Sequence, residues 1–476
     1  MSWAARRREL GCPPEARAGI IAAFLAGHHG SLLNDTELES RHGPVIVSRS
    51  EHNISRANIS PNALKVLYRL KSAGFEAFLV GGGVRDLLLD RHPKDFDVVT
   101  NADLDQIQDL FRNCRLVGRR FRLAHVRFGR DIVEVATFRA ANVVDPDDDD
   151  RAHSDSGRIL RDNVYGTIDE DVWRRDFTVN ALYYNITDFS IWDYVDGVGD
   201  VRARTLRLIG DPEKRYREDP VRMLRAVRFA AKLDFTLAPE TEAPLAALGN
   251  LLKDVPPGRL FDELLKLFQG GYAVQSFELL LRYDLLRYLF RDTQVELETP
   301  DREKIVDFIR RGLANTDQRV REDKPVTPMF LYALFLWFPI QALARRLESE
   351  GWNDGQAMLE ASQRIVATQQ TAFPRRFSSP MKELLTMQWR FGQRHGARAA
   401  RLLQHKRFRA AYDFLVLRAS CGEVDQGTID WWTELQSLPP EEQSKRLNVG
   451  GRQGGRRRRG GRRRSGRHHE INDVVV

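Results

Sequence analysis

The apolar pattern of residues 60–99 predicts a compact order of elements. Residues 76–80 (EAFLV) are an apolar run bounded by glycine, which predicts a buried strand. Residues 84–90 (VRDLLLD) have helical spacing, and residues 95–99 (DFDVV) predict the next strand. Ahead of them, Ser60 and Pro61 are the residue types that open a helix. We therefore expect a helix, a strand, a glycine turn, a helix and a second strand.

Three further strand-like runs follow a short helix that Asp103 caps. They cover residues 115–118, 123–128 and 131–138. The dipeptide Gly129-Arg130 separates the last two runs by the length of a tight hairpin turn. These runs predict that the sheet continues as a β-hairpin.

Beyond residue 210 the apolar positions keep helical spacing to about residue 440 without sustained alternation. This pattern predicts an α+β chain with a mixed-sheet head, an all-α body and a disordered basic tail. The predicted divisions are a flexible leader (1–55), the head (56–210), a small helical domain (211–275), a helical body (276–444) and the tail (445–476).

The positive charge of the chain is concentrated in the tail. The net charge is +8, and the segment Arg452–Arg467 holds nine arginines and no acid, so the remainder sums to 8 − 9 = −1. A Gly/Arg segment of this kind cannot bury a core and is typical of disorder. Its arginines suit the phosphates of nucleic acid, and a solubilising or membrane-surface tail is the alternative. The candidate RNA-binding residues are Arg456, Arg457, Arg458, Arg459, Arg462, Arg463 and Arg464.

Cysteines and apolar runs restrict the class of protein. Cys12, Cys114 and Cys421 have unrelated spacings, which favours a reducing cytoplasm over a disulfide framework or a zinc site. We expect no apolar run of about 18 residues, the length of a membrane span, and therefore no membrane association. The acidic segment 145–150 predicts an exposed loop without an assigned role.

The glycine turn and the Asp95-Phe96-Asp97 segment carry the candidate chemistry. Glycines at a strand-to-helix turn leave backbone N–H groups open to an anionic phosphate. Side chains two residues apart on a strand share a face, so Asp95 and Asp97 can bind one cation. Oxygen ligands of this kind suit Mg²⁺ together with substrate phosphates. The glycine run alone is also typical of an ordinary turn, and the Asp-Phe-Asp segment alone is typical of an exposed strand end. Because the two follow each other closely, together they favour a nucleotide site.

Glu134 is a candidate third metal ligand. It shares one strand face with Ile132 and Ala136, and a carboxylate in so apolar a strand needs a partner. A glutamate at a strand end in water is the equally open alternative.

A second group of polar residues lies downstream. Residues 174–182 (RRDFTVNAL) place two arginines, an acid and an asparagine before what we expect to be a helix start, where arginine forks suit triphosphate oxygens. Residues 217–225 (REDPVRMLR) open another helix with Asp219 and Arg222 three positions apart. A carboxylate beside a guanidinium complements the Watson–Crick edges of adenine and cytosine and rejects uracil and guanine. A simple salt bridge within the helix is the alternative interpretation.

The ordered motifs GGGVRD, DFD, RRDFTVNALYY and REDPVRMLRAVRF resemble the class II template-independent RNA nucleotidyltransferases, which include bacterial poly(A) polymerases and tRNA CCA-adding enzymes. The resemblance covers residues 59–270, and more loosely the helical body. The segment LVGRRFRLAHV at residues 116–126, the segment AAYDFLVLRA at 410–419 and the arginine-rich tail are similar to the poly(A) polymerase branch. The resemblance implies a head of the polymerase β type and a base-recognising neck at residues 211–275.

The resemblance also implies roles for individual residues. Asp95, Asp97 and Asp176 match the essential acids, with Asp95, Asp97 and Glu134 as metal ligands and Asp176 near the ribose or in assembly of the site. The implied nucleotide-binding residues are Gly81, Gly82, Arg85, Asp86, Arg175, Asp219, Arg222 and Arg225, of which Asp219 and Arg222 read the base.

The expected function is template-independent addition of adenylate from ATP to RNA 3′ ends, which uses two Mg²⁺ ions and releases pyrophosphate. We expect the enzyme to be a monomer. No amino-acid nucleophile is needed. CCA addition to tRNA is the first alternative, and an RNA-binding adaptor without catalysis is the second.

Overall fold

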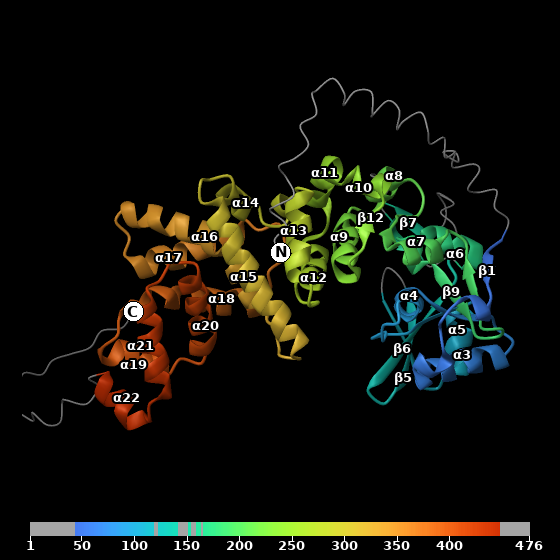
Figure 1. The fold of residues 1–476 in the computed structure, drawn as a ribbon, viewed down its shortest axis with the longest axis horizontal. Helices are drawn as coiled ribbons and strands as arrows, with labels where there is room; N and C mark the ends of the chain where they lie inside the picture. Colours follow the sequence, from blue (N-terminus) through green and yellow to red (C-terminus); the bar gives the residue numbers. More distant parts are fainter. Residues whose placement is uncertain (1–42, 119–121, 141–150, 154–158, 163–164, 448–476) are drawn as a thin grey trace, which may run out of the picture. The chain divides into compact units, whose positions relative to one another are not determined.

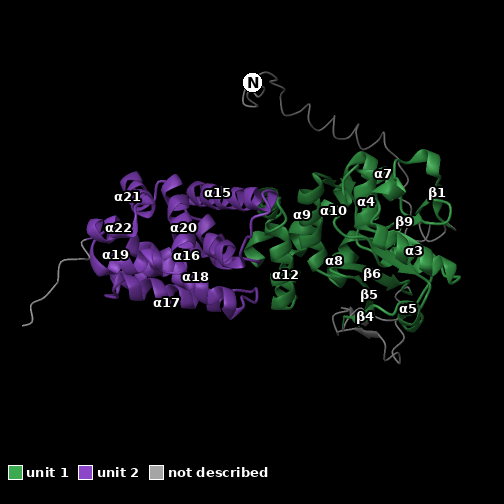
Figure 2. Cartoon of the chain, turned by 90° about the horizontal axis from the view of Figure 1, so that it is seen from below, with its two compact units in different colours: residues 1–288 green, residues 289–476 purple. Residues whose placement is uncertain are grey.

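A computed structural model of the chain describes residues 43–118, 122–140, 151–153, 159–162 and 165–447. The chain divides into two compact units, one ending at Tyr288 and the other beginning at Leu289 (Figures 1 and 2). Helix α13 (Ala273–Arg282) spans the predicted boundary at residues 275–276 and belongs to the first unit.

A mixed sheet of eight strands forms the framework of the first unit. Its spatial order is β1-β10-β9-β2-β3-β6-β5-β4, and β3 and β6 run parallel while the other neighbours are antiparallel. The strands are β1 (Val45–Val47), β2 (Ala77–Val80), β3 (Asp97–Thr100), β4 (Cys114–Val117), β5 (Leu123–Phe128), β6 (Asp131–Thr137), β9 (Leu182–Asn185) and β10 (Ile191–Asp193).

Helices cover the two faces of this sheet. Helix α3 (Pro61–Ser72), with Ser60 as its N-cap, packs on β2, β3 and β6. The opposite face is closed by α6 (Ile168–Arg174), whose Ile168 and Val172 enter a buried cluster with Phe78, Val99 and Tyr183. Helix α4 (Gly82–Leu88) follows the glycine turn, and α5 (Leu104–Leu110) packs on β4 and β5.

Several local predictions are confirmed. Asp103 caps α5 and forms a capping box with Gln106. The β5–β6 hairpin turns at Gly129 and Arg130, since Phe128 pairs with Asp131. The predicted α+β class is also confirmed, because a mixed sheet is followed by a body built mainly of helices.

Two predictions are wrong. The leader was expected to extend to residue 55, yet residues 45–47 form β1, which pairs with β10. A strand of three residues gains its stability from that pairing, which the local sequence does not reveal. The expected helix start in residues 174–182 is a short 3₁₀ segment, Thr178–Asn180, followed by β9, which is held between β2 and β10.

Helices continue the first unit after the sheet: α7 (Gly197–Ala203), α8 (Pro212–Glu218), α9 (Val221–Leu233), α10 (Pro239–Glu242), α11 (Leu245–Leu248), α12 (Pro257–Phe268) and α13. Two small two-stranded sheets pair β11 (Thr205–Leu206) with β12 (Thr236–Leu237), and β7 (Arg151–His153) with β8 (Ile159–Asp162). Helices α12 and α13 pack against α9, whose buried face is apolar.

The second unit is helical throughout its described residues. Its helices are α14 (Arg291–Leu297), α15 (Arg302–Arg321), α16 (Pro328–Ser349), α17 (Asp354–Ala367), α18 (Arg375–Met387), α19 (Gly396–Leu403), α20 (Phe408–Ser420), α21 (Gln426–Ser437) and α22 (Pro440–Arg446). Among the helices described, α16 alone is long and apolar enough to cross a membrane, which the sequence analysis did not anticipate. Of the most apolar window of α16, 72% is buried inside the protein, which is typical of a core helix.

Candidate active site

The acidic candidates meet at the end of the sheet where the glycine turn follows β2. Asp97 opens β3 and pairs with Val80, the last residue of β2, so that Gly81 follows beside it. On its other side Asp97 pairs with Glu134 in the parallel register of β3 and β6. Paired residues of neighbouring strands direct their side chains to the same face. The sheet therefore places Asp97 and Glu134 side by side at the glycine turn.

The turn itself packs against the segment that carries Asp95. Gly81 has a φ of 72°, a left-handed conformation that favours glycine. A Cβ built on Gly83 would lie 3.5 Å from the backbone oxygen of Asp95, so the first turn of α4 contacts that segment. Asp95 itself precedes β3 and is exposed, which corrects the predicted strand start by two residues.

The electrostatics of these acids fit a divalent cation. Burial, together with the negative charges of Glu134 and Asp95, raises the pKa of Asp97 to about 6, although Arg175 opposes the shift. Glu134 is half-exposed, and its Oε1 lies 3.3 Å from Nε2 of His125; its role as a metal ligand stays a prediction. Among the described residues no three acidic, histidine or cysteine side chains are grouped tightly enough to hold a metal by themselves. The donor set suits an ion that also takes oxygens from a bound triphosphate.

A cavity of about 250 Å³ opens beside these acids. It contains Asp97 and Glu134 and, from other elements, the three arginines Arg139, Arg174 and Arg175. Acids and arginines thus line one small volume, as the binding of a metal and a polyphosphate requires. Arg139 and Arg174 were missed as site residues, although Arg139 directly follows the strand that carries Glu134.

Arg175 is held in a buried network at the edge of this cavity. Its guanidinium donates to Asp171 Oδ2 through Nη2 (2.8 Å) and Nε (3.1 Å), and Nε also donates to the Tyr183 hydroxyl (2.7 Å). The Tyr183 hydroxyl in turn donates to Asp171 Oδ2 (2.8 Å). Nη1 lies 3.9 Å from the position of a Cβ on Gly81. The network therefore fixes the predicted triphosphate contact Arg175 next to the glycine turn.

Arg85 and Asp86 lie beneath the turn rather than on the cavity wall. Arg85 is only 1% exposed and donates to Asp86 Oδ1 through Nε (2.9 Å) and Nη2 (2.7 Å). Its Nη1 donates to Asn180, and its guanidinium lies over the Phe229 ring at 5.4 Å from the centroid. Arg85 is thus a buried and paired cation that links Asp86 to Asn180, and its contact with a nucleotide stays a prediction.

Asp176 is fully engaged by protein groups. Its Oδ2 accepts from Arg225 Nε at 2.8 Å and from Arg225 Nη2, while Oδ1 accepts from the Phe177 N–H (2.8 Å) and from Asn180 (3.1 Å). Burial opposes its ionisation, but these donors outweigh it and lower the pKa of Asp176 to about 2. The pair joins the segment between α6 and the 3₁₀ segment to helix α9, and the role of Asp176 in assembly of the site stays a prediction.

The expected base readers have other partners in the structure. Asp219, between α8 and α9, accepts from both terminal nitrogens of Arg259 at 2.7 and 2.6 Å. Arg222 donates to Glu218 (2.9 Å) and to the backbone oxygen of Arg215 (2.8 Å). Asp219 and Arg222 therefore do not form the salt bridge that the sequence left open, and each is held by a separate partner.

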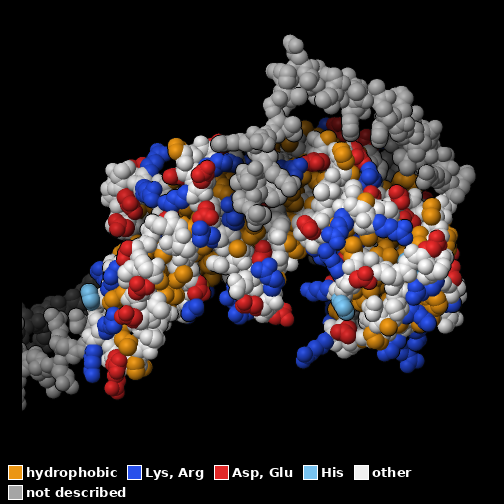
Figure 3. Space-filling model, in the orientation of Figure 1, with side chains coloured by type: hydrophobic (Ala, Val, Ile, Leu, Met, Phe, Trp, Pro, Cys, Tyr) orange, Lys and Arg blue, Asp and Glu red, His pale blue; other side chains and the backbone are white. Residues whose placement is uncertain are grey.

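The tail arginines, Arg456–Arg459 and Arg462–Arg464, and the acidic loop 145–150 lie outside the described residues. The face of the first unit that Figure 3 shows carries several groups of lysine and arginine side chains.

Three family descriptions match this chain. "Poly A polymerase head domain" matches residues 77–207, which include the acids and the glycine turn. "Probable RNA and SrmB- binding site of polymerase A" matches residues 234–297, and "Polymerase A arginine-rich C-terminus" matches residues 350–465.

Relatives support the same assignment. The chain is 48% identical over 418 residues to poly(A) polymerase I of Escherichia coli O6:H1, covering 85% of this chain and 88% of that protein. The CCA-adding enzyme of Lactobacillus helveticus is 37% identical over 239 residues, covering 50% and 55%. A solved CCA-adding enzyme, apo form II, has a TM-score of 0.57 at 20% identity over 84% of this chain and 89% of its own, which shows the shared fold. The chain belongs to the poly(A) polymerase I family.

Proposed function

We propose that this chain uses Asp95, Asp97 and the arginine-lined cavity to add adenylate from ATP to RNA 3′ ends, without a template and with release of pyrophosphate. The observation that carries the proposal is the register that sets Asp97 beside Glu134 and Val80, at the glycine turn. In this reaction the terminal 3′-OH attacks the α-phosphate, the α–β phosphoanhydride bond breaks and pyrophosphate leaves. No covalent enzyme intermediate is needed.

The chain's own residues bind and orient the two substrates. Arg139, Arg174 and Arg175 line the cavity with positive charge that would attract triphosphate oxygens, and Asp171 with Tyr183 fixes the Arg175 guanidinium. Asp95 and Asp97 would hold Mg²⁺, with Glu134 completing a site for two ions. Bound there, Mg²⁺ supplies activation of the 3′-OH and neutralisation of the charge that develops on phosphate.

Base selection rests on Asp219 and Arg222. Arg259 donates to both oxygens of Asp219 and the Val221 N–H donates to Oδ1 at 3.3 Å, which together orient the carboxylate that would accept from a base N–H. Arg222 is buried and positioned by Glu218. The carboxylate would accept from the amino group of adenine or cytosine, and the guanidinium would donate to the neighbouring ring nitrogen. The pair would therefore select these two bases.

The helical body and the tail would bind the RNA backbone. Between Glu383 and Asp413 the sequence contains no acid, and this stretch includes helix α19. Five of its Lys and Arg side chains are exposed: Arg390, Arg398, Arg401, Lys406 and Arg409. Exposed cations without alternating acids suit sequence-independent contacts to phosphates.

The proposal is tested with Asp97→Ala and Asp95→Ala, compared with Asp109→Ala on the exposed surface of α5. We expect the first two to abolish AMP incorporation into RNA while RNA binding, measured without ATP, is unchanged. The Asp109 variant should retain wild-type incorporation. Normal incorporation by Asp97→Ala would exclude this site as the reaction centre.

CCA addition to tRNA is the second candidate, because the base-reading pair admits cytosine as well as adenine. Incubation with all four nucleoside triphosphates separates the two: three nucleotides ending in A on trimmed tRNA indicate CCA addition, and long A tracts on generic RNA indicate polyadenylation. An adaptor without catalysis is tested by deleting residues 448–476, which leaves α22 intact. An enzyme keeps salt-sensitive activity after this deletion, whereas an adaptor that acts through the tail loses its function.

A further inference from the structure

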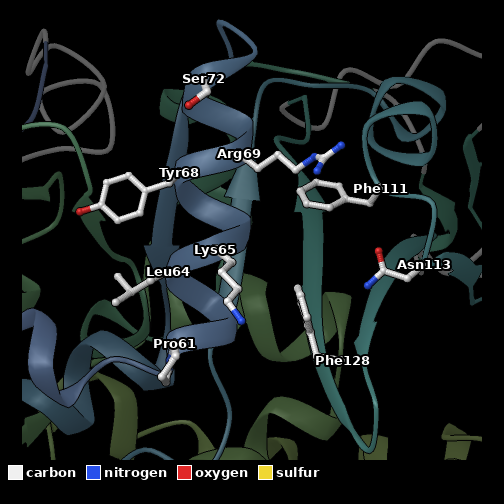
Figure 4. A pocket seen from close by; sticks show the side chains of 9 residues that line it. All are labelled: Pro61, Leu64, Lys65, Tyr68, Arg69, Ser72, Phe111, Asn113 and Phe128. Atoms are coloured by element: carbon white, nitrogen blue, oxygen red, sulfur yellow. The ribbon is translucent and has the colours of Figure 1, made fainter.

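A second groove lies on the first unit, on the sheet face opposite the acids. It encloses about 690 Å³ between helix α3 and the segment that joins α5 to β4 (Figure 4). Its described lining residues are Pro61, Leu64, Lys65, Tyr68, Arg69, Ser72, Phe111, Asn113 and Phe128. Helix α3 packs on β2, β3 and β6, whereas Asp97 alternates with the buried Val98 and lies on the other face. This groove is therefore distinct from the cavity beside Asp97.

The groove pairs cations with aromatic rings at two levels of α3. Lys65 Nζ lies 5.8 Å from the centroid of the Phe128 ring, and the Arg69 guanidinium lies 5.5 Å from that of Phe111. Figure 4 shows both cations extending from α3 toward these rings, while Tyr68 points to the other side of the helix. The two levels are one helical turn apart, about 6 Å along the axis. None of the described lining residues is acidic.

Exposed arginines connect the groove with the acidic end of the sheet. Phe128 lies at the tip of the β5–β6 hairpin, opposite Asp131, and Glu134 follows three residues along β6. Three strand residues span about 10 Å. Arg130 in the hairpin turn and Arg127, which alternates to the face of Glu134, are both exposed. A strand of a few nucleotides can follow these cations from the groove to Asp97.

We propose that this groove binds single-stranded RNA a few nucleotides upstream of the 3′ end that is being extended. The assignment rests on the proposed function, because it requires the 3′ end to lie at Asp97. Lys65 would contact a phosphate, and Arg69, positioned over the Phe111 ring, would contact a base. Phe128, half-buried, offers a ring edge and face to the neighbouring base.

RNA fits the groove better than an acidic protein segment does. The groove holds two cation–ring pairs one helical turn apart, and an RNA strand likewise presents a phosphate and a base in each nucleotide. The side-chain amide of Asn113 donates to the backbone oxygen of Arg127, which fixes the amide and turns its oxygen toward other donors, such as the amino groups of bases. Continuity with the hairpin arginines leads toward the site of nucleotide addition.

The test compares RNA primers of 3 and 20 adenylates with the full-length enzyme. The variants are Lys65→Ala and Lys65→Ala/Arg69→Ala, and the matched control is Lys71→Ala, an exposed lysine of α3 outside the groove. For the 20-mer we expect KM to rise about threefold in the single variant and about tenfold in the double variant. The slope of log affinity against log salt should fall by about 0.7 in both variants, because Lys65 supplies the one phosphate contact that either variant removes. The trinucleotide, too short to reach the groove, should keep its kcat/KM in every variant.

Crosslinking without ATP gives a readout independent of activity. A 20-mer with 4-thiouridine at single positions should crosslink to the peptide that carries Phe128 only from positions several nucleotides upstream of the 3′ end. Three results would overturn the proposal. They are equal effects on both primers, an effect of Lys71→Ala as large as that of Lys65→Ala, and an unchanged KM with no crosslink. The last result would leave the groove to an acidic protein partner. Failure of the wild-type enzyme to incorporate AMP would instead overturn the proposed function.

Discussion

The carboxylate of Asp176 and the guanidinium of Arg225 form a buried ion pair that joins the segment after α6 to helix α9. Arg225 Nε donates to Asp176 Oδ2 at 2.8 Å, and the other carboxylate oxygen is satisfied by Phe177 and Asn180. Two of the family motifs thus meet through one contact. The contact therefore ties the segment that follows α6 to helix α9 and contributes to folding stability.

Replacement of Arg225 by Ala should destabilise the first unit. The change leaves the Asp176 carboxylate buried without its cation, which costs roughly 3–5 kcal/mol when one partner of a buried pair is removed. Urea unfolding followed by circular dichroism measures the change. The paired variant Asp176→Asn/Arg225→Ala, which also removes the buried charge, should recover part of the loss; no recovery would show that the pair does not act as a unit.

The same pair gives a pH dependence of stability. The pKa of Asp176 is lowered from 3.8 to about 2 in the folded chain, so its contribution is complete above about pH 4 and is lost as pH falls toward 2. A shift of this size corresponds to about 2 kcal/mol. Urea unfolding at pH 5 and pH 3 should show a smaller loss of stability for Asp176→Asn than for wild type. Equal losses would contradict the lowered pKa.

Replacement of Asp97 by Asn should raise stability while abolishing activity. Burial and the nearby Glu134 and Asp95 disfavour the Asp97 charge, so at pH 7.5 and without divalent metal the ionised side chain costs roughly 1–3 kcal/mol. Thermal unfolding in EDTA should therefore give a higher Tm for Asp97→Asn than for wild type, and added Mg²⁺ should stabilise wild type only. A lower Tm for the variant in EDTA would contradict the crowding of negative charge at this edge.

Tyr183→Phe tests the positioning of Arg175. The variant removes the hydroxyl that accepts from Arg175 Nε and donates to Asp171, but it leaves the ring in the buried cluster. We expect KM for ATP to rise about three- to tenfold, while KM for RNA is unchanged, since one buried hydrogen bond contributes about 1 kcal/mol. The matched control is Tyr184→Phe, whose hydroxyl makes no hydrogen bond among the described residues. Equal effects of the two changes would mean that the hydroxyl network does not orient Arg175.

Arg259→Ala tests the base reader. Without Arg259, the Asp219 carboxylate loses the two guanidinium donors to its oxygens, while the Val221 N–H still donates to Oδ1 at 3.3 Å. We expect kcat/KM for ATP to fall about tenfold or more and the preference for ATP over UTP and GTP to narrow, because recognition depends on the orientation of the carboxylate. Steady-state incorporation with each nucleotide measures this. A uniform loss for all four nucleotides would assign Arg259 to the fold alone.

The sequence predicted those parts of the site that local chemistry defines. Gly81 needs a left-handed backbone, Ser60 and Asp103 cap helices, and Gly129-Arg130 suits a tight hairpin, so each was recognisable from its neighbours. Partners distant in sequence were not recognisable. Arg259 lies 40 residues from Asp219 and Arg225 lies 49 from Asp176, so the first pair depends on the packing of α12 against α9 and the second on the contact of α9 with the segment after α6. Strand β1 was missed because its stability comes from pairing with β10.

The most direct measurement of the central claim is incorporation of labelled nucleotides into a generic RNA and into tRNA lacking its 3′ end. Wild type should build long tracts of A from ATP on the generic RNA without a template, and Asp97→Asn should build none while it remains folded. Addition that stops after three nucleotides, or continued A addition by Asp97→Asn, would contradict the account.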